Sequence, residues 1–339
     1  MLKYFYNRNE PNGLTSMKIL MVIYVFLCPL LLSAAEPQKT YHDLLSVTFA
    51  SNNDGWACGR WGTILHTTDG GKTWNSQASG TDYTLTGIHF VDVQNGWAVG
   101  NQGTIIHTKD GGTTWVKQKS PVPYFLMAVQ FVNTKKGWIV TERTTILATE
   151  DGGATWQVQF KDQDFILRSL SFCDENNGWA VGEYGFIYHT DNGGKTWQHQ
   201  AGEYTLSLET MEMEGGNFLF DVVALNPKTA LAVGIEGYIA GTDNGGKTWV
   251  SIASGIPKRH FFGVASDKQG TLVIVGDALL IRKTDGTKSF SGVKVEPPIT
   301  YGWLYRVVSR GRSGFVAIGK GGRIYVSDPK GTIWQSTKY

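Results

Sequence analysis

The sequence predicts an all-β protein, a seven-bladed β-propeller made of four-stranded antiparallel blades. Three observations lead to this prediction. A pattern of about 41 residues recurs along the chain, each copy closes on a turn that resembles DGGKTW, and seven copies are present. The chain is also rich in Gly (42 residues) and in aromatic residues (12%), a composition typical of many short strands joined by tight turns.

The first 35 residues have the features of an export signal. Lys18 precedes an apolar run from Ile19 to Leu32, and small residues at Ser33 to Ala35 come before Glu36. The run is shorter than a membrane-spanning helix needs, and it contains Pro29. We expect residues 1–35 to be an N-terminal extension with a signal peptide and residues 36–339 to form the propeller. A retained membrane anchor is the alternative.

The charge balance excludes a general nucleic-acid binder. The whole chain has 31 Lys and Arg residues against 29 Asp and Glu residues. Without residues 1–35, 28 basic and 28 acidic residues remain. Binding to nucleic acid requires a basic excess or stripe, so we expect no nucleic-acid partner and only local electrostatic patches.

The repeats follow each other from residue 44 to residue 334. The first four are the most regular, with closing tryptophans 41 residues apart at Trp74, Trp115, Trp156 and Trp197. A Gly-Trp pair has the same spacing, at Trp56, Trp97, Trp138 and Trp179. Three looser copies close near Trp249, Phe290 and Trp334, and 11 extra residues precede the first of these.

Each copy contains four strand-like segments. The first has the pattern LxxVxF with alternating apolar residues, the second resembles GWAVG, the third resembles GTIIHT, and the fourth begins at the closing Trp. Such a unit cannot bury both of its faces alone, and stacking seven units around an axis solves this problem. The last copy supplies its own fourth strand from Trp334 to Tyr339, so a strand exchange between the termini is not required. The alternative is that residues 37–43 add to the edge of a blade and protect it.

The closing turn is an Asp-box, also known as a BNR repeat, and its chemistry is structural. Its Asp side chain can bond nearby backbone amides, its glycines permit positive φ, and its Trp can pack between blades. The Asp position is held by Asp69, Asp110, Asp151, Asn192, Asn244 and Asp285. The seventh copy has Pro329 there, which predicts a degraded turn. Because each of these residues lies on a separate blade, we expect no metal site.

The cysteines and histidines do not form a reactive group in the sequence. Cys58 and Cys173 lie in repeats one and four and resemble small buried apolar residues, so we expect no disulfide between them. His66, His107 and His189 occupy the same position in three repeats, which favours a packing role. We therefore expect neither a metal nor any other cofactor.

The Asp-box raises the possibility of a sialidase. Such an enzyme needs clustered arginines, a Tyr–Glu nucleophile pair and an acidic Asp. Residues 36–339 contain only nine arginines, and no Phe-Arg-Ile-Pro-like segment precedes the first Asp-box. No nucleophile elbow, zinc-protease motif or P-loop is present either. We expect a non-enzymatic protein, with a carbohydrate-active or carbohydrate-binding propeller as the alternative.

The repeats GWAVGxxGxIxxTxDGGxTW, their number and the export signal together resemble the photosystem II stability/assembly factor family. The resemblance extends from about residue 40 to residue 338 and is strongest in the first four repeats. It implies a seven-bladed propeller without catalytic activity in a periplasm or a compartment like the thylakoid lumen. It also implies that the protein binds a subunit of a membrane protein complex, or its precursor, during assembly. We expect a monomer that is at most peripheral to the membrane.

A partner would bind on the face that carries the turns between the second and third strands. In a propeller these turns lie on the same face as the connections between blades, opposite the Asp-boxes. They differ between repeats while the strands do not, and variable loops on a constant scaffold often carry function. Arg, Trp and Tyr are frequent anchors of protein interfaces. The predicted partner-binding residues are Arg60, Trp61, Arg143, Arg168, Tyr184, Arg259, Trp303 and Arg306. Arg168 and Arg306 belong to the innermost strands, where they can pair with carboxylates such as Asp221.

Overall fold

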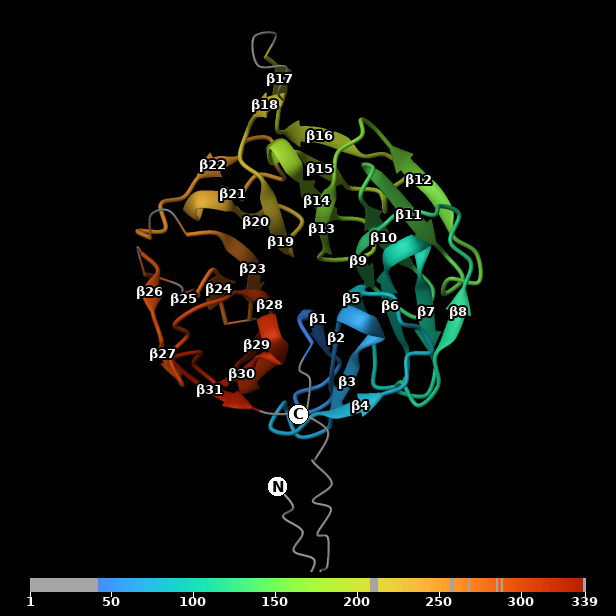
Figure 1. Ribbon diagram of the computed structural model, residues 1–339. Helices are drawn as coiled ribbons and strands as arrows, with labels where there is room; N and C mark the ends of the chain where they lie inside the picture. The colour runs from blue at the N-terminus through green and yellow to red at the C-terminus, as the bar shows by residue number, and fades with distance from the viewer. Residues whose placement is uncertain are drawn as a thin grey trace, which may run out of the picture. The chain divides into compact units, whose positions relative to one another are not determined.

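The computed structural model describes residues 42–207, 213–256, 259–267, 269–284, 286–287 and 289–337. They form seven antiparallel blades around a central axis, as Figure 1 shows, which confirms the predicted all-β propeller. The predicted signal lies outside the described residues. In the part of the chain that the structure describes, no helix is long and apolar enough to cross a membrane.

Within each blade, we call the strands a to d from the axis outwards. The first four blades contain β1 (Leu44–Phe49), β2 (Gly55–Gly59), β3 (Ile64–Thr67) and β4 (Asn75–Gln77); β5 (Leu85–Phe90), β6 (Gly96–Gly100), β7 (Ile105–Thr108) and β8 (Val116–Gln118); β9 (Leu126–Phe131), β10 (Gly137–Thr141), β11 (Thr145–Thr149) and β12 (Gln157–Lys161); and β13 (Leu167–Phe172), β14 (Gly178–Gly182), β15 (Ile187–Thr190) and β16 (Gln198–Ala201).

The last three blades are less regular. They contain β19 (Leu219–Asn226), β20 (Thr229–Gly234), β21 (Ile239–Thr242) and β22 (Val250–Ser251); β23 (Phe261–Ser266), β24 (Leu272–Gly276), β25 (Leu279–Lys283) and β26 (Ser291–Gly292); and β28 (Leu304–Ser309), β29 (Phe315–Gly319), β30 (Ile324–Ser327) and β31 (Ile333–Thr337). Short 3-10 turns connect strand b to strand c at η1 (Arg60–Gly62), η2 (Asn101–Gly103), η3 (Glu183–Gly185), η4 (Ile235–Gly237) and η6 (Lys320–Gly322). Another, η5 (Gly311–Ser313), lies between strands a and b of the seventh blade.

The core consists of clusters that each join two neighbouring blades. Trp56 of the first blade stacks on His66 of its own blade, with centroids 4.5 Å apart, and on Phe90 of the second blade, at 3.6 Å. Trp97 repeats this arrangement with His107 and Phe131. The closing Trp74 packs in the cluster that the first and seventh blades share. The structure therefore confirms that the tryptophans and the repeat histidines are packing residues.

The Asp-box turns have the bonding that their sequence predicts. Asp110 accepts hydrogen bonds from the hydroxyl groups of Thr108 and Thr114 and from the amide of Thr114, at 2.6–2.8 Å. Asn192 accepts in the same way from Thr190 and from the amide of Thr196. Asp69, Asp151 and Asn244 hold the corresponding turns, whereas Asp285 lies outside the described residues.

The prediction of a degraded turn in the seventh blade is wrong. Asp328, one residue before Pro329, accepts from the amides of Thr332 and Ile333 at 2.6 and 2.9 Å. The indole of Trp334 donates to the carbonyl of Gly331, as Trp74 does to Gly71 in the first blade. The box therefore tolerates a shift of its carboxylate by one position, because the side chain still reaches the same amides.

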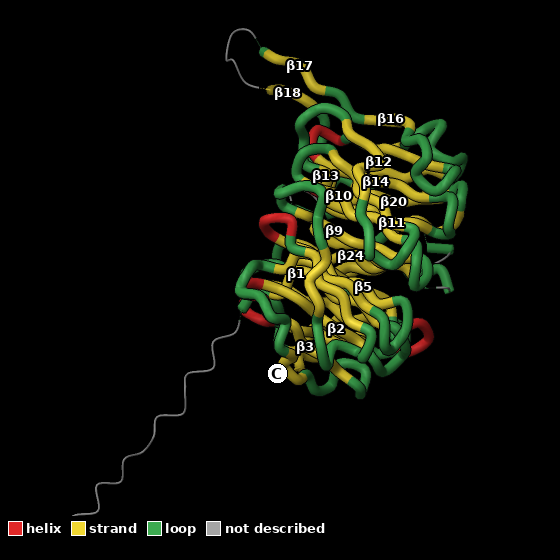
Figure 2. Tube along the Cα trace, turned by 90° about the vertical axis from the view of Figure 1, so that its right-hand side faces the viewer, coloured by secondary structure: helices red, strands yellow, loops and turns green. Residues whose placement is uncertain are grey.

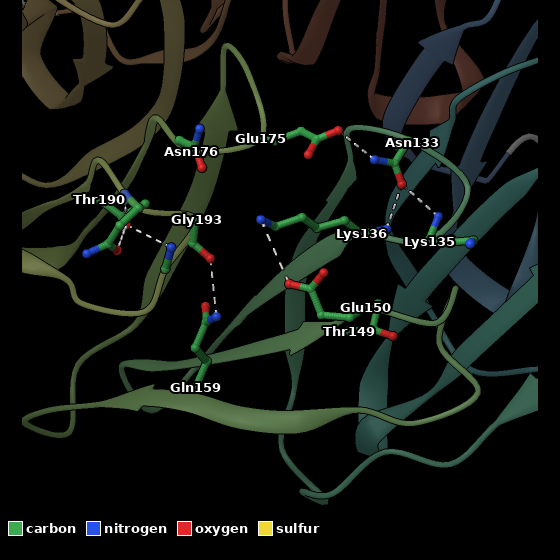
Figure 3. Close-up of polar contacts among 12 residues, drawn as sticks. Asn133, Lys135, Lys136, Thr149, Glu150, Gln159, Glu175, Asn176, Thr190 and Gly193 are labelled. Atoms are coloured by element: carbon green, nitrogen blue, oxygen red, sulfur yellow. Dashed lines mark hydrogen bonds and ion pairs between the residues drawn. The ribbon is translucent and has the colours of Figure 1, made fainter.

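A glutamine in strand d clamps each of the first four blades to the next one. Gln77 donates to the carbonyl of Gly111 at 2.9 Å, and Gln118 donates to Gly152 at 2.9 Å. The same bond joins Gln159 to Gly193 and Gln200 to Gly245. Figure 3 shows the third of these clamps beside a second contact of the same junction, in which Asn133 donates to Glu175 at 3.0 Å. Each acceptor is the first glycine of the next Asp-box.

The ring closes between the seventh and first blades without an exchange of terminal strands. Strand β31 is the seventh blade's own strand d, as predicted. A fifth strand that the sequence did not indicate, β27 (Lys294–Glu296), pairs with β31 in parallel from the outside. The buried Arg310 reaches across the junction and donates to the carbonyl of Gly70 at 2.9 Å. Its guanidinium also donates to the carbonyls of Ser313 and Ser327.

The extra residues before the fifth blade form a hairpin. Strands β17 (Tyr204–Leu206) and β18 (Met213–Gly215) pair antiparallel and project beyond the ring in Figure 1. Residues 208–212, which include much of the acidic and Met-containing segment of this connection, lie outside the described residues.

Candidate functional site

The two faces of the ring carry different kinds of loop. The b–c turn of the first blade meets a connection between blades, since the amide of Gly62 donates to the carbonyl of Tyr83 at 3.0 Å. The Asp-box meets an a–b loop instead, since the amide of Gly70 donates to the carbonyl of Asn53 at 2.9 Å. Figure 2 shows most of the 3-10 turns on one side of the ring, which agrees with this division. We call that side the b–c face.

Backbone strain is concentrated in the turns of the b–c face. In six of the seven blades the b–c turn places a residue other than glycine at positive φ, between 39° and 56°: Trp61, Gln102, Thr144, Tyr184, Glu236 and Ala278. The seventh blade has Gly321 at this position. A side chain costs about 1 kcal/mol in this region, and the Asp-box turns avoid the cost by using glycine. The b–c turns therefore keep side chains at a cost in stability, as functional surfaces often do.

The second residue of strand a faces the mouth of the central channel. These residues are all half-buried: Leu45, Thr86, Met127, Arg168, Phe220, Phe262 and Tyr305. The last three form an arc across blades five to seven, with Phe220 and Phe262 centroids 5.1 Å apart and Phe262 and Tyr305 centroids 6.2 Å apart. Arg168 extends the arc into the fourth blade, 6.0 Å from the Phe220 ring centroid. Burial raises the pKa of Tyr305, so its hydroxyl stays protonated.

Arg306 ties non-adjacent blades together below this mouth. From the seventh blade it pairs with Asp221 of the fifth, and it lies 3.4 Å from the hydroxyl of Ser169 in the fourth. Asp221 is almost fully buried and also accepts from Ser169 and from the amide of Val264 in the sixth blade, at 2.6 and 2.9 Å. One carboxylate thus connects four blades. Arg306 and Asp221 line a cavity of about 300 Å³ along the axis.

The other predicted arginines each pair with a carboxylate on the b–c face. Nitrogen–oxygen distances are 3.1 Å for Arg60 with Asp43, 3.9 Å for Arg143 with Asp164, 3.4 Å for Arg168 with Glu183 and 3.8 Å for Arg259 with Asp277. All four guanidinium groups are about a third to a half exposed. Exposed pairs of this kind contribute about 0–1 kcal/mol, so they can exchange partners readily.

The two tryptophans outside the repeat pattern differ in exposure. Trp61 is 68% exposed at the tip of its turn. Trp303 is half-buried, because Lys320 lies 4.4 Å above its ring and Tyr305 packs edge-on at 6.0 Å. Tyr184 is also half-buried and packs between Phe165 and Phe218, with centroids 5.1 and 5.2 Å away. On this face the indole ring of Trp61 is therefore exposed, whereas the rings of Trp303 and Tyr184 pack against neighbouring side chains.

Chemically, this arrangement can bind a chain with carboxylates and apolar side chains. The arginines around the mouth can pair with carboxylates, and the arc of Phe220, Phe262 and Tyr305 can contact apolar groups. Among the described residues, no group of three or more His, Cys, Asp and Glu side chains is placed to hold a metal ion. Cys58 is buried, and Cys173 is half-buried rather than fully buried as expected.

The sequence interpretation missed the aromatic arc. Apart from Arg168 and Arg306, it selected residues of variable loops, whereas Phe220, Phe262 and Tyr305 lie within strands. A signal was available, because each follows the first buried residue of strand a, where Leu45, Thr86 and Met127 stand in the first three repeats. At this repeat position the first three blades have aliphatic or polar residues, and the last three blades have aromatic residues. This change distinguishes the aromatic side of the channel mouth from the other side.

Comparisons with known proteins place this geometry in context. A family model described as photosynthesis system II assembly factor YCF48 matches residues 34–121 and 117–207, which together span just over half of the chain. Among curated proteins nothing matches.

Solved structures share the fold at low sequence identity. YCF48 bound to a D1 peptide has a TM-score of 0.69 and 20% identity over 85% of this chain and 93% of that one. YCF48 from Cyanidioschyzon merolae has a TM-score of 0.69 and 19% identity over 87% and 98%. A GH74 xyloglucanase from Xanthomonas campestris has a TM-score of 0.70 and 12% identity over 88% of this chain and 55% of the enzyme.

Proposed function

The chain belongs to the family of photosynthesis system II assembly factors described as YCF48, and on that basis we propose that it is a binding protein without catalytic activity. Its partner is a subunit of a membrane protein complex, or the precursor of one, and the b–c face holds a peptide segment of that subunit. The protein acts after export, in a periplasm or a compartment like the thylakoid lumen, and it works without a cofactor.

The observation that carries this proposal is the combination of exchangeable arginines and aromatic rings at the channel mouth. Arg168 lies 6.0 Å from the ring of Phe220 at one end of the arc, and Arg259 pairs with Asp277 of the sixth blade, to which Phe262 belongs. A structure of similar fold is YCF48 bound to a D1 peptide, which supports a peptide ligand for this chain as well.

Binding would proceed by exchange of partners at the arginines. Glu183 and Asp277 hold the two guanidinium groups in place in the free protein, at 3.4 and 3.8 Å. A peptide carboxylate can replace either of them in a better, bidentate geometry, while an apolar peptide side chain covers the aromatic arc. The other predicted residues, Arg60, Trp61, Arg143, Tyr184 and Trp303, surround this centre and would extend the contact. Arg306 would support it from below through Asp221.

The test is capture of the partner from membranes of the source organism by residues 36–339, with the captured subunit identified by mass spectrometry. Binding of peptides from that subunit is then measured for the wild type and for Arg168→Gln, Arg259→Gln and Phe262→Ala. We expect each variant to bind about tenfold more weakly, the loss typical of one interface anchor. Arg312→Gln is the control, because Arg312 is exposed on the opposite face in η5.

Two results would overturn the proposal. One is capture of no membrane-protein subunit, or capture that the three variants leave unchanged. The other is hydrolysis of xyloglucan or of a sialoside by the purified protein, which would replace a binding function by a catalytic one.

A further inference from the structure

The sector of the b–c face where the ring closes has a composition that the rest of the face lacks. We call it the closure patch, and it consists of Arg60, Trp61, Tyr301, Trp303, Lys320 and Arg323. Trp61 and Tyr301 are 68% and 69% exposed, more than any other large apolar or aromatic side chain that the structure describes. Two aromatic rings thus point into solvent in one sector of the surface.

The patch is continuous across the junction between the seventh and first blades. Asp43 accepts from the amide of Gly321 at 2.8 Å and from the guanidinium of Arg60 at 3.1 Å, which joins the two b–c turns. Lys320 lies 4.4 Å above the ring of Trp303. Arg323 lies 4.6 Å above the ring of Tyr301. Cations and aromatic rings therefore alternate along the patch.

Charge also separates this sector from the others. The b–c turns of blades three to six each contain a carboxylate: Glu142, Glu183, Glu236 and Asp277. Those of blades seven and one contain Lys320 and Arg60 instead. The closure patch contains three cations, one of which, Arg60, pairs with Asp43. Asp82 lies on the connection that follows the first blade. Asp277, in the b–c turn of the sixth blade, forms a backbone bridge with Trp303, and its carboxylate pairs with Arg259.

We propose that the closure patch docks onto an anionic lipid surface. Trp and Tyr rings favour the boundary between headgroups and acyl chains, while Lys and Arg are attracted to anionic headgroups. A protruding indole such as Trp61 suits a soft surface, whereas an interface with another protein would place it in a pocket. The closure patch shares Arg60, Trp61 and Trp303 with the predicted rim of the peptide site, but lipid binding is measured without a peptide and does not depend on that site.

The entry point of the chain supports a lipid surface over an acidic protein. Asp43, at the start of the described residues, pairs with Arg60 of the patch at 3.1 Å, and His42 directly precedes it. Only nine residues, 33–41, separate them from the apolar run 19–32, and nine residues reach at most about 30 Å. While that run is in a bilayer during export, the patch is held within reach of the same bilayer.

The test uses residues 36–339, which contain the complete ring with its own core. Vesicles of phosphatidylcholine alone are compared with vesicles that also contain phosphatidylglycerol, by flotation at low and high salt. We expect binding to the anionic vesicles only, weakened by salt. The variant Trp61→Asn, Tyr301→Ser and Lys320→Gln should lose most of this binding, because it lacks both exposed rings and one charge, whose removal near an anionic surface costs about fivefold in binding.

The design keeps folding separate from binding. Asn tolerates the positive φ of Trp61, so the turn is preserved in the variant. The control Lys72→Gln with Lys195→Gln removes two charges from Asp-box turns on the opposite face, and it should bind like the wild type. Brominated lipids should quench a part of the tryptophan emission that the Trp61→Asn variant lacks.

Three results would overturn the proposal. The wild type could fail to float with anionic vesicles, or the control could lose binding while the patch variant retains it. A wild type that ignores lipid but binds polyglutamate through the same residues would assign the patch to an acidic protein instead.

Discussion

At the scale of single residues, one carboxylate or amide oxygen organises each Asp-box turn. The hydroxyl of Thr114 is the main cause that lowers the pKa of Asp110 to about 2, followed by the Thr114 amide and the Thr108 hydroxyl. Asp151 has the same bonds and the same pKa of about 2. Asn192 and Asn244 show that a neutral amide oxygen can accept the equivalent bonds. The turns held by Asp therefore respond to acid, and those held by Asn do not.

These pKa values predict how stability depends on pH. An unfolded Asp titrates near 3.9, above the folded value, so the carboxylates stabilise the fold above about pH 4 and this contribution disappears as the pH falls towards 2. We expect the melting temperature of the triple variant Asp69→Asn, Asp110→Asn and Asp151→Asn to decrease less between pH 4 and pH 2 than that of the wild type. Thermal melts at closely spaced pH values measure this.

The matched control is Asp191→Asn, which removes an exposed charge next to a box that already uses Asn192. It should keep the acid response of the wild type. Burial lowers the pKa of His107 to about 4, so its effect on stability falls in a separate window between about pH 6.5 and 4. Equal acid responses in the wild type and the triple variant would contradict the role assigned to the boxes.

At the scale of elements, the b–c turns keep strained residues where glycine would fit. Gln102 has φ 53° and is exposed, whereas Gly321 holds the same position in the seventh blade without strain. We expect Gln102→Gly to stabilise the protein by about 0.5–1 kcal/mol, because relief of the left-handed conformation exceeds the added chain entropy of glycine. Urea unfolding measures the change.

The neighbouring Asn101 provides the comparison, since its φ is not positive. Asn101→Gly should destabilise the protein, because it adds chain entropy without relieving strain. If Gln102→Gly also lowers the midpoint of unfolding, the turn would not be strained.

The glutamine clamps show what the sequence offered at this scale. A Gln follows the closing Trp by three residues in each of the first four repeats, at Gln77, Gln118, Gln159 and Gln200. The recurring Gln could be recognised in the sequence. The glycine that accepts its hydrogen bond could not, because that glycine lies 34 or 45 residues further along the chain. Repeat spacing predicts which residues are equivalent. It does not show which equivalent residues meet across a junction.

At the scale of the whole molecule, Arg310 performs at the closing junction what indoles and glutamines do elsewhere. The carbonyl of Gly111 accepts from Trp56 and Gln77. In the last blade Val316 and Thr337 occupy the corresponding positions. Val316 has no side-chain donor, and the side chain of Thr337 is shorter than that of Gln. The guanidinium of Arg310, coming from the a–b loop, bonds to Gly70 instead.

Removing this guanidinium should open the ring first at the closing junction. We expect Arg310→Met to lower the free energy of unfolding by about 2–3 kcal/mol, because a buried charged donor with three carbonyl partners is lost. Amide hydrogen exchange should accelerate most in β1 and β31. Arg312→Met, in the same loop but exposed, should change neither quantity. A uniform loss of protection from hydrogen exchange around the ring would contradict the role of Arg310 in holding the seventh blade to the first.

The same comparison explains which parts of the fold could be predicted. The seven blades, their strands and the Asp-boxes follow from local patterns that recur, such as the 41-residue spacing of Trp74 and Trp115. Features that occur once had no pattern to reveal them. Arg310, the Asp221 hub and the parallel strand β27 each depend on contacts between distant segments, and the closure patch depends on which blades become neighbours.

The place of β31 in its sheet has a consequence for the order of synthesis. This strand lies between β30 and β27, although it is the last strand of the chain. Strand β27 is therefore synthesised well before β31, with which it pairs, and it stays unpaired until β31 has followed. Trp334, which is fully buried, is also supplied by β31. The seventh sheet cannot be completed before β31 has been synthesised, so a chain that stops short of Ile333 carries six complete blades and an unclosed ring.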